Sequence, residues 1–245
     1  MAGRRLHLAA ALIGVCIHGA GAQDLQESIL AGDRIAAAHI ITTSADLSAQ
    51  TELGTLLHVA ALMDDTSSTQ LLLDRGAPID ARTEGYEMTR LHVAAGYNKP
   101  HVAAVMLDRG AALEVRELSG RTPLLLAVQS GAEELVQLLL AHGAEANTAS
   151  VKCGTPLSIA IQRNSVAMAA MLLAHGAVPE SIFIGTAPPL VEAARIGNPE
   201  MIRLLVRQGA DLNAPDEGGL SPLAAALAAG HEEAATLLRQ YGARG

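Results

Sequence analysis

Aromatic side chains are almost absent from this 245-residue sequence, which contains no Trp, one Phe and three Tyr. Aromatic side chains line many of the pockets that bind organic cofactors. This composition therefore argues against a cofactor, and we expect none. Half of the residues are nonetheless hydrophobic. Because these are mainly Leu, Ala, Val and Ile, they suit thin layers between packed helices.

Cysteine is also scarce, and Cys16 and Cys153 are the only two. Cys16 lies in an N-terminal segment that has two early arginines, an apolar run over residues 6–17 and small residues up to Ala22. This order is typical of a secretory signal peptide, and we expect cleavage after Ala22. The mature chain then holds one thiol and forms no intrachain disulfide.

Two other export signals fit this segment less well. Lipidation at Cys16 requires a lipobox, which Ile13-Gly14-Val15 matches poorly, and Arg4-Arg5 begins only a weak twin-arginine pattern. The apolar run is also shorter than the roughly 20 residues that cross a bilayer as a helix. We therefore expect a periplasmic or secreted protein that is not inserted in a membrane after cleavage.

Basic residues are outnumbered, since removal of residues 1–22 leaves 15 Lys and Arg against 25 Asp and Glu. Nucleic acids and anionic membranes attract proteins largely through cationic side chains, so this charge balance disfavours both kinds of partner. Only two of the 17 basic residues in the whole chain are Lys, a bias typical of a GC-rich genome. Together with the signal peptide, this bias indicates a bacterial periplasm.

The sequence does contain a regular repeat. At six places a Leu is followed three residues later by an Ala, and a Gly-Ala pair recurs in the same phase. The period is 34 residues once and 33 thereafter, which is typical of stacked-repeat architectures. The leucines are Leu57, Leu91, Leu124, Leu157, Leu190 and Leu223, and the glycines are Gly76, Gly110, Gly143, Gly176, Gly209 and Gly242.

The repeats resemble those of the ankyrin family, most closely at residues 120–127 (Gly-Arg-Thr-Pro-Leu-Leu-Leu-Ala) and 138–147 (Leu-Leu-Leu-Ala-His-Gly-Ala-Glu-Ala-Asn). The resemblance covers about residues 53–245. It implies an all-α ankyrin-repeat solenoid, in which stacked helix-turn-helix units are joined by loop or β-turn fingers. The family's Leu-His step remains only at His58 and His92, so we expect looser hydrogen bonding between the later repeats.

The predicted domain order is the signal peptide (1–22) and then, as the resemblance implies, a divergent N-terminal capping repeat (23–52) and six ankyrin repeats (53–245). The limits of these repeats fall at about 53–83, 84–116, 117–149, 150–182, 183–215 and 216–245. The one extra residue falls within residues 77–88, which we expect to form a loop because loops tolerate insertions.

Start and stop signals predict two short helices in each repeat. Thr122 and Thr155 are placed to cap the first helix, and a Pro follows each of them at the first helical position. Gly143 and Gly176 are placed to end the second helix. The residues expected on the apolar faces of the third of the six repeats are Leu124, Ala127, Val128, Leu135, Val136, Leu138 and Leu139.

Motifs for catalysis or metal binding are not found. The sequence has no Gly-rich phosphate loop, nucleophile elbow or paired metal-ligand helix motif. His142 and His175 occupy equivalent repeat positions, which lie roughly 10 Å apart in stacked helices and thus too far apart to share a zinc ion. We expect no metal site and no enzyme.

In ankyrin arrays, the fingers and the exposed side of the first helices form a concave face that binds other proteins. The resemblance therefore implies a protein partner, and Tyr and Arg are common at interface hot spots. Phe183 and Ile184 have a second interpretation, as apolar residues that fill an irregular repeat junction. The predicted partner-binding residues are Tyr86, Met88, Tyr97, Leu118, Arg121, Gln129, Lys152, Arg163, Phe183, Ile184, Arg195 and Leu220.

The function we expect is that of a monomeric, non-catalytic scaffold for protein–protein interaction. Two specific forms are an immunity protein that neutralises an exported toxin and a protector of an exported enzyme under oxidative stress. The other function classes are an enzyme whose site converges from several repeats and a structural spacer without selectivity. Cys153, which follows Lys152 in a loop, is either a redox-active thiol or a passive one.

Overall fold

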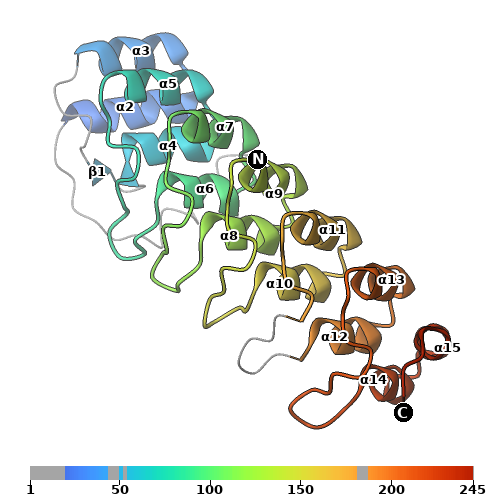
Figure 1. Cartoon of the computed structure of the whole chain (residues 1–245). Coiled ribbons are helices and arrows are strands. Elements are labelled where there is room, and N and C mark those ends of the chain that lie inside the picture. Colours follow the sequence, from blue (N-terminus) through green and yellow to red (C-terminus); the bar gives the residue numbers. More distant parts are fainter. Residues whose placement is uncertain (1–19, 44–49, 52–53, 181–186, 245) are drawn as a thin grey trace. The chain divides into compact units, whose positions relative to one another are not determined.

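The computed structural model describes residues 20–43, 50–51, 54–180 and 187–244 (Figure 1). These residues form helices and loops, apart from β1 (Gln50–Thr51) and β2 (Gly54–Thr55), which pair antiparallel. The chain divides into two compact units, residues 1–118 and residues 119–245. Each unit is built from stacked helix pairs, so the predicted all-α fold is confirmed.

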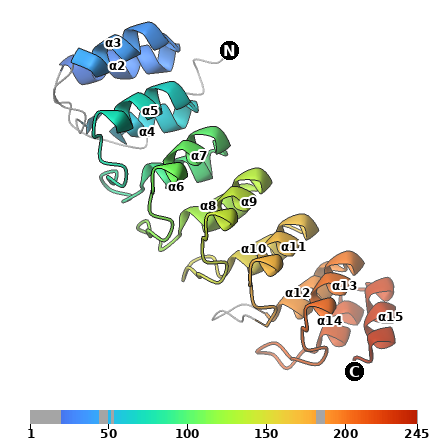
Figure 2. The same cartoon turned by 45° about the horizontal axis from the view of Figure 1, so that its top comes forward.

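The described part of the first unit consists of three helix pairs. The two helices of each pair contact one another, the first helices contact each other in one row, and the second helices do so in another (Figure 1, Figure 2). The pairs are α2 (Ala20–Ala31) with α3 (Arg34–Thr43), α4 (Leu56–Met63) with α5 (Thr66–Asp74), and α6 (Arg90–Gly96) with α7 (Pro100–Asp108).

The second unit repeats this arrangement, with one row of first helices and one row of second helices (Figure 1). Its pairs are α8 (Pro123–Ser130) with α9 (Glu133–Ala141), α10 (Pro156–Gln162) with α11 (Val166–Ala174), α12 (Pro189–Ile196) with α13 (Pro199–Arg207), and α14 (Pro222–Ala228) with α15 (Glu232–Tyr241).

The N-terminal predictions fall largely outside the described residues. Ala20 is the first described residue and the first residue of α2, so the predicted cleavage after Ala22 falls inside this helix. The predicted capping repeat, residues 23–52, contains α3 and all of α2 except its first three residues. Among the described residues, no helix combines the length and the apolar character needed to cross a membrane. Export and cleavage stay predictions.

The first helices of the second unit begin at hydroxyl side chains. Thr122 Oγ1 accepts a hydrogen bond from Leu125 N (3.4 Å), and Thr155 Oγ1 accepts one from Ser158 N (3.1 Å). The Pro that follows each Thr loses no helical hydrogen bond, because the first N–H groups of a helix have no partner within it. The predicted caps are confirmed, and Pro188, which has no hydroxyl, makes no side-chain cap to α12.

Two second helices, α9 and α11, end at a His followed by a Gly. After α9, Gly143 adopts a φ of 92°, a left-handed conformation that a Cβ would make costly. The preceding His142 donates from Nδ1 to Leu138 O (2.9 Å), and the equivalent His175 makes the same contact with its own helix at 2.9 Å. Each of these histidines therefore satisfies a carbonyl at the end of a helix.

The recurring Leu and Ala residues form the core. The six leucines are at most 4% exposed, and the six alanines that follow them three residues later are completely buried. A small side chain at this depth lets neighbouring helices approach closely, because interiors are packed without spare volume. The recurring Ala therefore sets the spacing between helices in both units.

One core prediction for α9 was wrong. Leu138 is only partly buried, whereas Leu140 is 3% exposed. The buried residues of α9 are Leu135, Val136, Leu139 and Leu140. Their spacing of one and four residues follows the 3.6-residue helical period, which turns Leu138 away from the core.

The extra residue of the array lies in a loop, as predicted. The loop between α5 and α6 spans residues 75–89, one residue more than the loop of residues 142–155 between α9 and α10. Glu87, near the end of the longer loop, has a φ of 53°. A left-handed residue other than Gly is strained, so the loop around it must be held by other contacts.

Buried polar groups provide those contacts in the first unit. His58 is 1% exposed, and its Nδ1 accepts the Thr55 N–H (3.2 Å). The ring proton must then be on Nε2, which donates to Met88 O (3.1 Å) in the loop before α6. Arg90 donates from Nη2 to Thr55 Oγ1 (3.0 Å). These bonds join the start of α4 to the start of the next repeat.

Arg90 is an unusual residue for its position, the first of α6, where the first helices of the second unit have Pro. Its side chain is completely buried, and Nη1 donates to Ile79 O (2.5 Å) and to Ala81 O (3.3 Å). Burial lowers the pKa of Arg90 to about 10, an effect that nearby Asp80 opposes. The guanidinium is therefore charged at neutral pH and fixes the loop to the helix.

The repeats of the second unit are connected by Asn and Ser side chains. Asn147 donates from Nδ2 to Gly176 O (2.8 Å), and its Oδ1 accepts Val178 N (2.9 Å). Ser150 Oγ donates to Ser119 O (2.8 Å). The Asn147 bond is common to both units, since the equivalent Asp80 Oδ1 accepts Ala112 N (3.1 Å) in the first unit. At the His position itself, Ser158 Oγ bonds Thr155 O of its own repeat (2.8 Å) and Leu125 has no polar side-chain atom, which agrees with the expected loosening.

Replacing Ala127 with Leu should destabilise the second unit. Ala127 is completely buried in α8, so a larger side chain would overpack the layer at a cost of about 1–3 kcal/mol. We expect a lower melting midpoint by circular dichroism. Ala167→Leu is the matched control, since it adds the same side chain at an exposed position of α11. Equal midpoints for the two variants would contradict close packing at Ala127.

Acidification should destabilise the first unit through His58. Burial, followed by the charge of Arg90, lowers the pKa of His58 from 6.5 to about 3. Between these values the unfolded chain binds a proton that the folded chain does not, so the free energy of unfolding falls as the pH falls. The free energy of unfolding should fall by up to about 1.4 kcal/mol for each pH unit within this range. Above pH 6.5 the stability contributed by neutral His58 is fully present.

The measurement is urea denaturation at several pH values, compared between the wild type and His58→Gln. The variant should lose part of the dependence of the unfolding free energy on pH, whatever its overall stability. His142→Gln is the control, because His142 is exposed and lies in the second unit. The same pH slope in the wild type and in His58→Gln would show that His58 is not held neutral.

Candidate protein-binding surface

The first helices of the second unit expose little surface. All residues of α8 from Pro123 to Val128 are buried, as are all residues of α10 from Pro156 to Ile161. Their exposed residues lie at the C-terminal ends, for example Gln129 and Gln162. The second helix of the pair and the neighbouring first helices cover the rest. The expectation that a side of the first helices is exposed to a partner is therefore corrected for α8 and α10, because only their C-terminal ends are exposed.

In the first unit the structure brings together two of the predicted residues. Tyr86 and Leu118 lie in neighbouring loops and are 46% and 67% exposed. Leu118 N donates to Tyr86 O (3.0 Å), so a backbone hydrogen bond holds the two loops together. Large apolar side chains that stay in water offer free energy to any partner that covers them.

Met88 and Tyr97 also belong to the first unit but differ in surroundings. Met88 is partly buried, and its N–H donates to Thr83 Oγ1 (3.1 Å) while its carbonyl accepts the bond from His58. Its main role is thus to fix the loop that carries Tyr86. Tyr97 directly follows α6 and is 56% exposed. Tyr97 therefore has the free surface that a contact residue needs.

Three predicted residues of the second unit meet at Gln129. Arg121 Nη1 donates to Gln129 Oε1 (3.0 Å), and Arg163 Nη1 donates to Gln129 O (2.8 Å). The Arg163 guanidinium also covers Gly131 so closely that an added Cβ would clash with it. Gln129 and Arg163 are exposed, and Arg121 is partly exposed. The sequence spacing alone did not show that the two Arg side chains converge.

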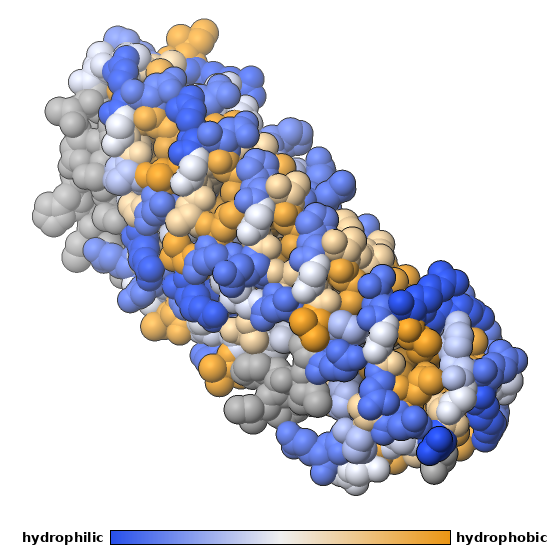
Figure 3. All heavy atoms as spheres, viewed as in Figure 1, coloured by the Kyte–Doolittle hydropathy of each residue, from blue (hydrophilic) through white to orange (hydrophobic). Residues whose placement is uncertain are grey.

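Lys152 lies in the loop between α9 and α10. The sequence-based prediction did not include the residue before it, Val151. Lys152 Nζ donates to Ser119 Oγ (3.5 Å), across to the preceding loop. Val151 is 89% exposed and occupies the same repeat position as Leu118, 33 residues earlier. That register was the signal that could have identified Val151. Hydrophobic atoms reach the surface at the outer ends of such loops (Figure 3).

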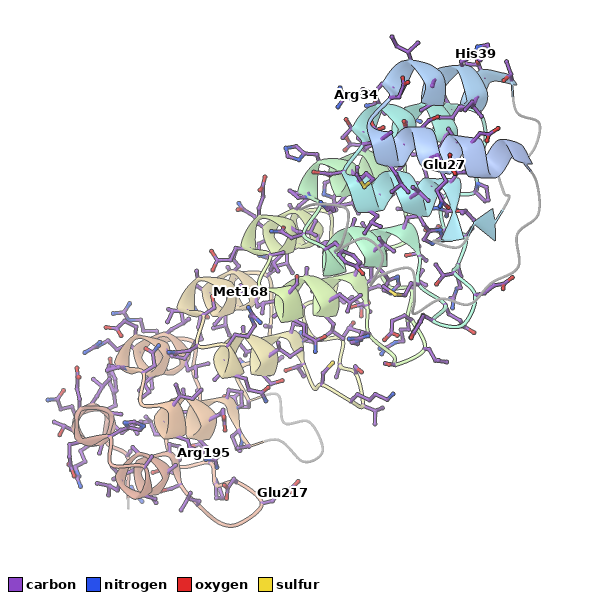
Figure 4. The ribbon with its side chains drawn as sticks, turned by 180° about the vertical axis from the view of Figure 1, so that it is seen from behind. Glu27, Arg34, His39, Met168, Arg195 and Glu217 are labelled. Atoms are coloured by element: carbon purple, nitrogen blue, oxygen red, sulfur yellow. The ribbon has the colours of Figure 1, made fainter. Side chains whose placement is uncertain are left out.

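Arg195 and Leu220 lie near the loop that precedes α14. Arg195, on α12, pairs with Glu192 (2.6 Å) and with Asp216 (3.2 Å). Asp216 also accepts the N–H of the partly exposed Leu220 (2.8 Å). Figure 4 shows Arg195 on its helix and Glu217 on the neighbouring loop. Arg195 therefore serves mainly to hold this loop against α12.

A pocket of about 140 Å³ lies between α10 and α12. Glu192 and Arg195 are the only ionisable groups of its lining, and they are paired with one another. A paired acid and base at this distance leave no group ready for proton transfer, so the pocket does not have the features of a catalytic cleft. Its lining residues are Ser158, Ile161, Gln162, Ala187, Pro189, Glu192 and Arg195.

Some predictions are not tested by this geometry. Phe183 and Ile184 lie outside the described residues. Cys153 is partly buried in the turn that Ser150 and Gly154 close, and its thiol is not in a disulfide. Within the described ranges, no group of three or more His, Cys, Asp or Glu residues is arranged to hold a metal ion.

Comparisons with known proteins identify the repeats. The family model described as "Ankyrin repeats (3 copies)" matches residues 91–182 and 185–244, and the model described as "Ankyrin repeat" matches residues 54–84. These matches cover more than half of the chain. A comparison with curated protein sequences finds no match.

Solved structures of ankyrin repeat domains are similar to this chain. The domain of Bcl-3, a member of the IkappaB protein family, has a TM-score of 0.79 and 29% identity over 88% of this chain and 97% of that one. A domain from Acinetobacter baumannii AYE has a TM-score of 0.72 and 30% identity over 77% of this chain and 98% of its own.

The ankyrin repeat domain of human ASB11 has a TM-score of 0.75 and 28% identity over 87% of this chain and 96% of its own. These similarities, the family models and the stacked helix pairs agree with one another. The chain therefore belongs to the ankyrin-repeat family, whose repeat domains are typically non-catalytic modules that bind other proteins.

Proposed function

We propose that this chain is a protein-binding scaffold of the bacterial periplasm, and that its partner docks on loop tips and on the ends of first helices. The signal-like order of residues 1–22 supports export. The observation that carries the proposal is the exposed apolar pair of Tyr86 and Leu118, held together by a backbone hydrogen bond.

The loop under Tyr86 is fixed before any partner arrives. Arg90 donates hydrogen bonds to the carbonyls of Ile79 and Ala81, and His58 donates one to the carbonyl of Met88. A loop that is already ordered loses little conformational entropy on binding, so more of the contact energy appears as affinity. The buried groups therefore support the tip without touching the partner themselves.

The two side chains can supply a useful share of the binding energy. Covering a large apolar side chain contributes about 1.5–3 kcal/mol, and each 1.4 kcal/mol is roughly a tenfold change in the dissociation constant. Tyr also offers a hydroxyl group for a hydrogen bond, which is one reason that it is common at hot spots. Tyr97 adds a second exposed ring in the same unit.

Removing the apolar pair should abolish partner capture. Wild-type protein and a Tyr86→Ser, Leu118→Ser variant would each be immobilised and exposed to periplasmic extract, and retained proteins would be identified by mass spectrometry. We expect a protein that the wild type retains and the variant does not, with affinity lowered at least about tenfold when that protein is purified.

The matched control is an Ile35→Ser, Val178→Ser variant, which also removes two exposed apolar side chains, 85% and 45% exposed in the native chain. It should retain the partner as the wild type does. If all three proteins retain the same set, or if none retains a specific protein, the proposed binding surface or the scaffold function is wrong. Melting curves of each variant show that loss of capture does not reflect unfolding.

A further inference from the structure

Acidic residues are unevenly distributed in the second unit. The whole chain has 25 Asp and Glu, yet residues 146–179 contain none, and neither do residues 119–132. The Lys and Arg residues within these two stretches are Arg121, Lys152 and Arg163. An acidic protein thus contains a local basic region made by α8, α10 and residues 119–122 and 146–155 of the loops before them, which follow Glu117 and Glu145.

The three cations lie on one continuous surface. Arg121 and Arg163 both contact Gln129, at 3.0 Å and 2.8 Å, and Lys152 reaches Ser119 Oγ, two residues before Arg121. We call the surface formed by Ser119, Arg121, Gln129, Val151, Lys152 and Arg163 the basic strip. It runs from the loop tips to the end of α8.

Two cations of this strip, Lys152 and Arg163, are not neutralised by carboxylates of the described residues. Among the described residues, neither Lys152 nor Arg163 forms an ion pair. Glu133 lies at the start of the second helix α9 and accepts a bond from Ser165 Oγ (3.2 Å). Arg195, in contrast, is balanced by Glu192 and Asp216 and is not part of the strip.

We infer that the basic strip binds an acidic segment of the partner protein, with Lys152 and Arg163 facing its carboxylates and Val151 facing an apolar side chain. The inference rests on the proposed scaffold function and names the chemistry of the partner. Complementary charge attracts the correct partner and repels others, and here the net negative charge of the rest of the chain repels acidic proteins elsewhere on its surface.

A nucleic acid fits the strip less well than an acidic peptide. The phosphate backbone requires a longer array of cations for useful affinity, and the chain as a whole has a formal charge of −8. Single-stranded nucleic acids also stack their bases on aromatic rings, and residues 119–180 contain no aromatic side chain.

Charge reversal in the strip provides the first test. A short fluorescein-labelled oligoglutamate peptide is titrated with the full chain in low-salt buffer, and its anisotropy is measured. Lys152→Glu, Arg163→Glu should bind at least about tenfold more weakly than the wild type, and added NaCl should weaken wild-type binding. Circular dichroism melts, and the single variant Lys152→Glu in a loop, show that the effect does not come from unfolding.

The matched control is Arg207→Glu, Arg239→Glu, which changes the net charge equally but on the exposed ends of the second helices α13 and α15. It should bind the peptide within about twofold of the wild type, because distant exposed charges are screened. Equal weakening in both double variants, or no binding by the wild type, overturns the inference. Tighter binding of a fluorescein-labelled oligothymidylate than of the peptide overturns it in favour of nucleic acid.

The partner captured from extract separates this inference from the proposed function. If Lys152→Glu, Arg163→Glu still retains the partner while Tyr86→Ser, Leu118→Ser loses it, the acidic-segment inference fails and the scaffold function holds. If neither the wild type nor any variant retains a specific partner, the scaffold function itself fails. Loss of the partner in both variants supports both proposals.

Discussion

A pair of short helices cannot bury its own apolar face, and this constraint governs the structure. In each unit the neighbouring pairs cover one another, so the core is a series of thin layers and not one central mass. Close approach of the layers requires a small side chain at a fixed place, which is why Ala60 and Ala127 are completely buried beside leucines. The shortage of aromatic residues follows from the same limited space.

Polar groups buried by this packing must be satisfied, and side chains that reach the next repeat do so in both units. In the first unit, His58 and Arg90 make bonds that join a helix start to the next loop. In the second unit, Ser150 joins two loops, and Asn147 makes the same bond to the next repeat that Asp80 makes in the first. In both cases the hydrogen bonds lie beneath the loops, so they order the segments that carry the exposed residues.

The function follows from what packing leaves on the surface. Because α8 and α10 are buried almost to their ends, the row of first helices offers a partner only loop tips and helix ends, whereas the second helices also expose positions such as Gln137. Apolar side chains at the tips, such as Leu118, are not needed for stacking, and Arg163 keeps an exposed charge although it also bonds Gln129 O of the neighbouring repeat. Their presence in these places is the physical basis for proposing a protein partner and for assigning an acidic character to part of it.

The sequence by itself determined the period, the helix caps at Thr122 and Thr155 and the identity of the core leucines, because these depend on local geometry and on a repeated pattern. It also placed Tyr86, Tyr97 and Leu118 on the surface correctly. Only the tertiary structure decided that the first helices expose little more than their ends, that Arg90 is buried, and that Arg121 and Arg163 meet at Gln129. Some of these features depend on hydrogen bonds between residues more than 30 positions apart in the sequence, such as Arg90 with Thr55 and Arg163 with Gln129. The spacing of residues along the chain does not specify how a long side chain reaches from one repeat to the next.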